Sequence, residues 1–177
     1  MKSLFQLKYD ENDCLVTLQN TEDSYWMNWA VGEIPWGTVK LPEGIQVHKS
    51  HLIEENGCLQ ESYIFKNEMG FPVYFRESDL GVILSLPDSY VDSDECMRRH
   101  CHTHIWCGEE ASWIKAVRMS GIAPHLGMIL RRGSLKGYSV MRDFEKSSND
   151  RGSFLLHPGI DMLQPGEEYE LCFEWFW

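Results

Sequence analysis

The stretch FQLKYDENDCLVTL, residues 5–18, decides the fold class. Apolar residues stand at every second position in 5–9 and again in 14–18, on either side of the polar turn 10–13. Successive side chains of a β-strand point to opposite faces, so an alternation of this kind predicts strands. We therefore expect the chain to open with an antiparallel β-hairpin.

The same alternation recurs outward along the chain, bounded by Gly, Asn and Asp turn residues. The further predicted strands are 45–53, 58–66, 80–86, 99–106, 112–120, 126–132, 135–142, 153–157 and 168–177. A helix is predicted only near 92–98, while 20–43 is expected to be irregular and 147–152 a tight turn. Short strands at this spacing indicate an all-β antiparallel sandwich with little helix, and 1–177 is predicted to be one domain.

Composition excludes several classes of protein. The 177 residues carry 16 Lys and Arg against 27 Asp and Glu, a net charge of −11, which argues against nucleic acid as a partner. No apolar run reaches the roughly 20 residues of a membrane span, and the start MKSLFQLKYD lacks a secretory apolar stretch. We therefore expect a cytoplasmic protein with no membrane partner, whose six cysteines are free thiols.

The last predicted strand is aromatic on one face, which carries Tyr169, Leu171, Phe173, Trp175 and Trp177. Chain ends are usually frayed and polar. One interpretation is that the polypeptide naturally continues into a further domain on which this strand packs. The other is an edge strand whose end tucks into the core. The first predicts a missing C-terminal partner domain, and self-association where aromatic side chains stay exposed.

The run RHCHTHIWC, residues 99–107, is the first candidate for a site. In a strand, His100, His102, His104 and Trp106 share one face. Alternate imidazoles can converge on one divalent ion such as zinc, which would give a small metal-dependent enzyme built on the three histidines. The alternative is a polar sheet face that uses the imidazoles for hydrogen bonds. The CxxC pairs that make structural zinc sites specific are absent from the sequence.

The same face suits carbohydrate, because sugars stack their C–H faces on aromatic rings and hydrogen-bond to imidazoles and carboxylates. The candidates for carbohydrate or domain contact are His102, His104, Trp106 and Glu109, with Trp26, Trp29 and Trp36 if the segment 20–43 folds over that surface. The alternative for the Trp residues is burial in the core or between domains.

Catalytic motifs are not found. Glycoside hydrolysis requires two carboxylates at a set separation, and the acidic clusters at 92–95, 109–110 and 143–145 are typical of solvated turns. The sequence contains no GxSxG elbow, phosphate-binding glycine loop or HExxH. No catalytic residue and no cofactor is therefore predicted.

Several short motifs carry a resemblance that is strongest from 99 to 177. They are CHTHIWCG (101–108), AVRMSG (116–121), PHLG (124–127), GSLKGYS (133–139), SNDRG (148–152), LLHP (155–158) and LQPGE (163–167). Together they resemble the N-terminal β-sandwich region of large bacterial proteins of the six-hairpin (α/α-toroid) glycosidase type.

The resemblance implies a supersandwich similar to that of galactose-mutarotase-like proteins. It also implies that the general acid and base lie on a helical toroid that follows the sandwich. The leading hypothesis is therefore a non-catalytic accessory domain of a glycoside hydrolase that packs against a missing catalytic α/α toroid. An independent carbohydrate-binding module and the small metal-dependent enzyme are the alternatives.

Overall fold

The computed structural model describes residues 3–141 and 152–177. The predicted turn at 147–152, except for Gly152, and the acidic cluster at 143–145 lie outside the described residues. The described part of the chain is an antiparallel β-sandwich, in which every strand pairing is antiparallel. The predicted all-β fold class is thereby confirmed.

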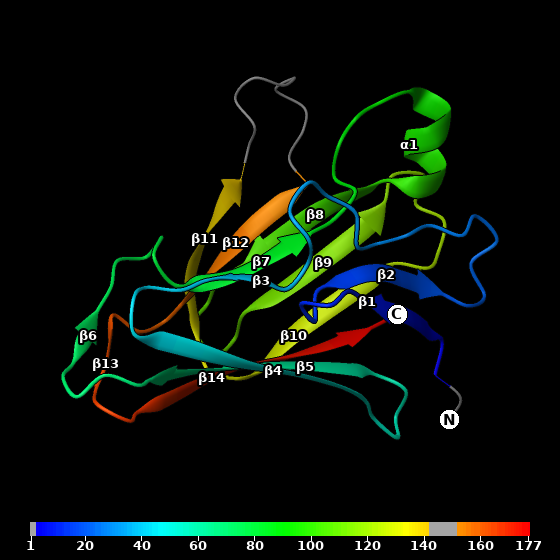
Figure 1. Cartoon of the computed structure of the whole chain (residues 1–177). Helices are drawn as coiled ribbons and strands as arrows, with labels where there is room; N and C mark the ends of the chain where they lie inside the picture. The colour runs from blue at the N-terminus through cyan, green and yellow to red at the C-terminus, as the bar shows by residue number, and fades with distance from the viewer. Residues whose placement is uncertain (1–2, 142–151) are drawn as a thin grey trace.

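A six-stranded sheet forms one layer (Figure 1). Its order is β4 (Ile45–Ile53), β5 (Leu59–Asn67), β14 (Glu168–Phe176), β10 (Leu126–Arg132), β9 (Trp113–Arg118) and β8 (Cys101–Trp106). The last strand of the chain thus lies in the middle of the sheet, between β5 and β10. Long-range pairings of this kind hold segments together that are far apart in sequence.

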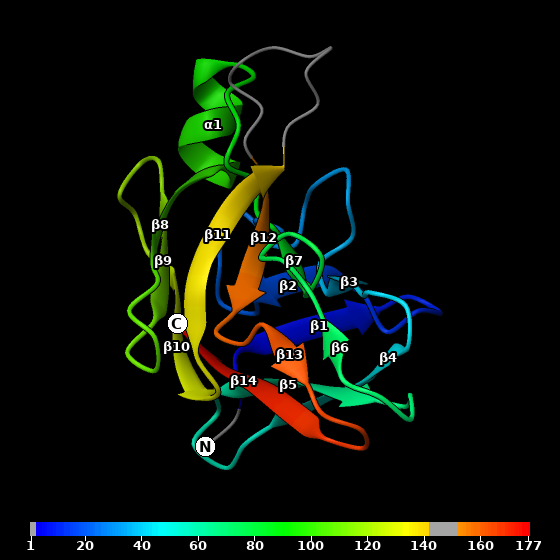
Figure 2. The same ribbon diagram turned by 90° about the vertical axis from the view of Figure 1, so that its left-hand side faces the viewer.

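The second layer is a four-stranded sheet, with the order β11 (Leu135–Met141), β12 (Ser153–Pro158), β7 (Gly81–Ser85) and β3 (Thr38–Lys40). The hairpin of β1 (Phe5–Tyr9) and β2 (Leu15–Asn20) is joined to the segment before β3 by a bridge from Leu15 to Trp36. In Figure 2, β8, β9 and β10 stand to one side of β11 and β12.

The hairpin differs in one detail from its predicted pattern. A bulge between Lys8 and Tyr9 shifts the register, so that Tyr9 pairs with Leu15. Leu15 and Leu18 are consequently buried, whereas Val16 is only half-buried. The extra residue of a bulge breaks the strict alternation that the sequence suggested.

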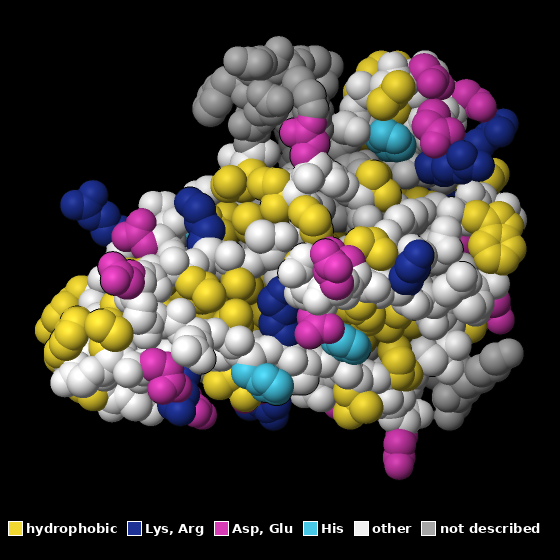
Figure 3. Space-filling model, viewed as in Figure 1, with side chains coloured by type: hydrophobic (Ala, Val, Ile, Leu, Met, Phe, Trp, Pro, Cys, Tyr) yellow, Lys and Arg dark blue, Asp and Glu magenta, His cyan; other side chains and the backbone are white. Residues whose placement is uncertain are grey.

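Two peripheral elements mark the ends of the molecule in Figure 1. Helix α1 (Ser93–Arg99) lies at one end, and the Asp92 carboxylate accepts a 3.0 Å hydrogen bond from the N–H of Glu95, as expected of an N-cap. The ribbon of β6 (Val73–Tyr74) and β13 (Met162–Leu163) lies at the other. Hydrophobic side chains gather on the surface near that ribbon (Figure 3).

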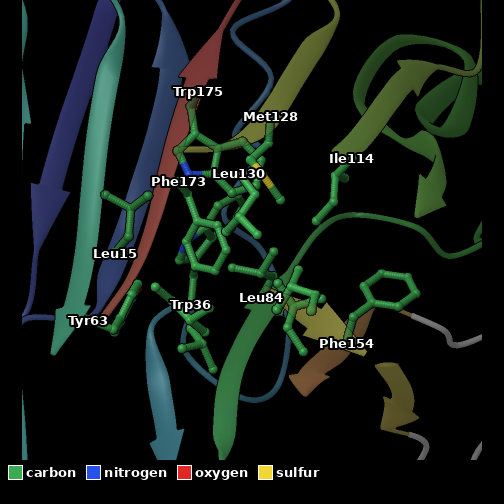
Figure 4. Packing of buried hydrophobic residues seen from close by; sticks show 14 of the residues in the cluster. Leu15, Trp36, Tyr63, Leu84, Ile114, Met128, Leu130, Phe154, Phe173 and Trp175 are labelled. Carbon is green, nitrogen blue, oxygen red and sulfur yellow. The ribbon is translucent and has the colours of Figure 1, made fainter. Parts of the chain in front are cut away.

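Aromatic side chains fill the space between the layers (Figure 4). The Trp36 and Trp175 rings lie 4.7 Å apart between centroids, and Tyr63 and Phe173 pack beside them. Leu171, Phe173 and Trp175 are fully buried, so the aromatic face of the last strand points into this core. Burial of large aromatic surfaces supplies much of the stability of a sandwich of this size.

Most strand predictions hold, with β4 and β10 at the predicted bounds. Strand β8 begins at Cys101 rather than at 99, because α1 continues through Arg99. The short strands β3, β6 and β13 were not predicted, since two or three residues are too few to show a period. All six cysteines are free, four of them buried. None of the helices in the described residues has the length and apolar character needed to cross a membrane.

Candidate functional site

The outer face of the six-stranded sheet, which points away from the core, is set by the alternation on its strands. On β8, Cys101 is buried while His102, His104 and Trp106 are exposed. On β9, the inward residues Ile114 and Ala116 are likewise buried. Along both strands, every second side chain therefore points outward.

Strand register aligns these outward side chains in rows across the sheet. Trp106 of β8 is the direct partner of Trp113 of β9, which in turn pairs with Ile129 of β10. Trp106 is 58% and Trp113 39% exposed. Large apolar side chains in adjacent exposed positions form a surface that typically contacts another molecule.

The neighbouring row contains a glycine. His104 pairs with Lys115, Lys115 with Gly127, and Gly127 with Phe176 of β14. A Cβ atom at position 127 would lie only 2.5 Å from the Phe176 ring. The Phe176 side chain thus leans over a backbone position that only glycine leaves open.

A hollow of about 370 Å³ lies in the outer face beside Gly127 and the Phe176 ring that covers it. Its lining comes from β9, β10 and β14 and from the residues next to them, and includes Trp113, Lys115, His125, Gly127, Ile129, Phe176 and Trp177. We call this site the Gly127 hollow. It has aromatic walls and a cationic side chain at its edge.

The arginines of β10 already have partners. Arg131 donates two hydrogen bonds, of 3.1 and 2.6 Å, to Glu174, and Arg132 donates two, of 2.6 and 2.9 Å, to Glu170. The hydrogen bond from Arg132 lowers the pKa of Glu170. Lys115, by contrast, forms no ion pair with any carboxylate in residues 3–141 and 152–177.

Three of the predicted site residues lie together on this face, namely His102, His104 and Trp106. Glu109 follows in the loop after β8, with a φ of 55°. Its backbone N–H and C=O both bond to Leu135, which ties the six-stranded sheet to β11. The Glu109 side chain is exposed beyond the end of the strand.

The structure places two of the three Trp residues of segment 20–43 in the core. Trp29 and Trp36 are core residues, 0% and 1% exposed, because their loop folds into the space between the layers. This burial removes both from the set that a surface ligand contacts. Trp26 is 59% exposed and lies in the loop after β2, which reaches the end of β9 through the ion pair of Asp23 with Arg118.

The histidine cluster is not assembled as a metal site. His100 precedes β8 and ends α1, and its Nδ1 lies 2.6 Å from the carbonyl oxygen of Ser89. Its imidazole is thus held by Ser89, outside β8. Within the described residues, no group of three His, Cys, Asp or Glu side chains is placed to hold a metal ion.

Sequence reasoning missed the residues that shape the hollow: Trp113, Lys115, Gly127 and Phe176. The alternation Trp113-Ile114-Lys115-Ala116 does place Trp113 and Lys115 on one face. Which strand lies beside β9, however, depends on tertiary pairing. The sequence therefore shows that Trp113 and Lys115 share one face of a strand, but it does not show that they border a hollow.

The fold is that of an antiparallel β-sandwich with an aromatic outer face on its larger sheet. In structure it is similar to a polysaccharide lyase, with a TM-score of 0.85 and 25% sequence identity. The match covers 97% of this chain and 32% of the lyase chain, so this chain spans about a third of the lyase's length. No protein-family model and no curated protein sequence matches the chain.

Proposed function

We propose that this chain is a non-catalytic accessory β-sandwich of a larger carbohydrate-active protein, and that it holds glycan on the outer face of its six-stranded sheet. The observation that carries the proposal is the structural match, which includes nearly the whole chain and a third of a polysaccharide lyase. Domains are the units that larger proteins combine, so a match to about a third of the lyase supports a role as one domain of a larger protein.

The chemistry of the outer face supports glycan contact. Trp106 and Trp113 offer exposed ring surface in one row, and His102 and His104 offer hydrogen-bonding groups beside it. Aromatic rings with a few polar groups are the usual means of orienting a small ligand. The partner in this proposal is a catalytic α/α toroid of glycosidase type, and the sandwich is of the supersandwich subtype.

The two carboxylates of β14 on this face are poorly suited to hydrolysis of a glycan. Cleavage of a glycosidic bond by a hydrolase uses two free carboxyl groups across the sugar. The carboxylates of Glu170 and Glu174, on the central strand β14, each bind an arginine through both oxygens. This supports a binding role in preference to hydrolysis at this face.

The test uses the purified chain and a panel of neutral and acidic polysaccharides. We expect no new reducing ends and no unsaturated products, but slower migration through native gels that contain a bound glycan. The double variant Trp106→Ala/Trp113→Ala should lose this retardation. Tyr74→Ala, which changes an exposed aromatic side chain on β6 and not on this sheet, should keep it.

Turnover by the chain alone that disappears on replacement of a single carboxylate would contradict the accessory role. Equal retardation of the double variant and the wild type would contradict glycan contact at this face, even if the chain remained inactive. The accessory role and the glycan contact are thus contradicted by different results.

A further inference from the structure

We propose that Ser139 and His157 form a nucleophile–base pair that hydrolyses esters of short acyl groups. The pair lies on the four-stranded sheet, whereas the proposed glycan contact lies on the six-stranded one. The non-catalytic role of the chain concerns cleavage of the glycan, and removal of an acyl group leaves a glycan chain uncut. The inference is carried by the two hydrogen bonds of one imidazole and by the open position beside it.

The two side chains come from neighbouring strands and share one face. Leu156 of β12 belongs to the core, so His157, the next residue, points to the opposite face of the sheet. Gly137 of β11 is the direct partner of His157, and Ser139 stands two positions further along the same face. Because β11 is an edge strand and Ser139 is only half-buried, this part of the face lies at the rim of the sandwich.

The hydrogen bonds of His157 fix its tautomer. Its Nδ1 atom contacts the carbonyl oxygen of Glu77, which can only accept, so Nδ1 carries the proton of the neutral imidazole. Nε2 therefore has a free lone pair, and the Ser139 hydroxyl, 2.8 Å away, donates to it. A hydroxyl held by an imidazole that a third group orients is the arrangement that activates a serine. Because His157 is only 3% exposed, bulk water has little access to the ring.

Room for an acyl group exists beside the pair. Apart from its chain neighbours, a Cβ atom at Gly137 would have only the His157 ring within 4 Å among the described residues, at 3.8 Å. The position over Gly137, which adjoins both side chains, is therefore open to a short acyl group. Beyond Leu135, no strand of the described residues pairs with the outer edge of β11, so its backbone N–H groups are the donors for an oxyanion.

The reaction follows from these positions. As Ser139 Oγ bonds to the carbonyl carbon of the ester, its proton passes to Nε2 of His157. The C–O bond to the alcohol then breaks, the imidazolium returns the proton to the leaving oxygen, and the acyl group stays on Ser139. Water, deprotonated by His157, attacks the acyl carbon and releases the carboxylic acid and the free serine. Because Glu77 offers a neutral carbonyl where a carboxylate would stabilise the imidazolium, we expect slow turnover, best seen with activated esters.

The test uses the purified chain with p-nitrophenyl acetate and p-nitrophenyl octanoate. We expect release of p-nitrophenol from the acetate, and slower release from the octanoate because only a short acyl group fits over Gly137. A fluorophosphonate probe, which reacts with activated serines, should label Ser139, as peptide mass spectrometry would show. Ser139→Ala should abolish the label and lower acetate turnover by about a hundredfold.

Further variants assign the effect to the pair. His157→Gln should also lower turnover, since the amide can bond to the hydroxyl but cannot take its proton. Ser50→Ala, which removes an exposed hydroxyl from β4, is the matched control and should change neither turnover nor label. Gly137→Val should fill the open position and lower turnover while Ser139 and His157 stay in place. Melting curves verify that each variant folds.

Turnover of Ser139→Ala equal to that of the wild type would overturn the proposal, as would probe label on other residues but not on Ser139. A folded wild type with neither turnover nor label, destabilised by Ser139→Ala, would give the pair a purely structural role in joining β11 to β12 and would also overturn it. None of these results bears on the glycan contact, whose test measures retardation by polysaccharides.

Discussion

The carboxylate of Glu61 accepts a 3.2 Å hydrogen bond from the indole Nε1 of Trp36, inside the core between the two layers. A carboxylate there has been withdrawn from water, and burial raises the pKa of Glu61 to about 7, although the Trp36 hydrogen bond and the charge of Lys49 oppose the rise. The core therefore contains a group that titrates near neutral pH.

The Glu61 pKa has a consequence for stability. Between the ordinary value of 4.5 and the folded value of about 7, the native state binds a proton that the unfolded state has released. The free energy of unfolding therefore falls as the pH rises through this window, by about 3 kcal/mol. Glu61→Gln keeps an acceptor for Trp36 and should remove this slope.

Urea unfolding at about pH 5 and about pH 8 measures the effect. Glutamine in place of Glu61 carries no charge at either pH, so the Glu61→Gln variant should be more stable than the wild type at the higher pH. The same replacement at exposed Glu110 is the control. A pH slope that persists unchanged in Glu61→Gln would show that another group causes it.

A second buried charge pair joins the loop after β2 to β9. The Arg118 Nη2 atom lies 2.5 Å from the Asp23 carboxylate, and both side chains are buried. Burial raises the pKa of Asp23, but hydrogen bonds from Arg118 and from the N–H groups of Met27 and Tyr25 outweigh it, so the pKa is lowered overall.

Arg118→Met should destabilise the protein by about 3–5 kcal/mol, because it leaves the Asp23 carboxylate buried without its cation. Adding Asp23→Asn should recover part of this loss, since the amide carries no charge. Chemical unfolding followed by Trp fluorescence provides the comparison. A loss below about 1 kcal/mol for Arg118→Met would mean that water reaches Asp23.

Two tryptophans should respond differently to truncation. Trp29→Ala removes a fully buried ring and should cost about 3–5 kcal/mol. Trp106→Ala changes an exposed side chain and should alter stability by no more than about 0.5 kcal/mol. Melting curves of the two variants check the placement, and similar losses would contradict it.

The position of His100 leads to a prediction about metal. Because its imidazole contacts Ser89 and does not join His102 and His104, purified protein should contain no stoichiometric zinc. Elemental analysis checks this, and a chelator should leave the melting temperature unchanged. One equivalent of metal that is lost in His102→Ala would contradict the geometry.

The fold was largely predictable because strand alternation is local. Residues 126–132 show their apolar positions in sequence, and β10 has those bounds. Bulges and two-residue strands were not predicted. A bulge interrupts the period of two, and a two-residue strand is too short to show a period. The Tyr9–Leu15 pairing is an example of the first kind.

The candidate site was only partly predictable. His104 and Trp106 were found because β8 alone places them on one face. Gly127 was not found, since a glycine in a strand has meaning only when its neighbours are known. Lys115 gains its significance from the Gly127 and Phe176 beside it, and those residues come from other strands.

The sequence by itself determined which residues form strands and which of their faces is apolar, because both follow from a period of two along a local segment. Tertiary structure decided the order of the strands, and with it which residues outside the regular strands are buried. Trp29 is buried because its irregular loop folds between the layers, which the local sequence of that loop does not show. The Gly127 hollow likewise exists only because β14, much later in the chain, pairs with β10 and brings Phe176 beside Gly127.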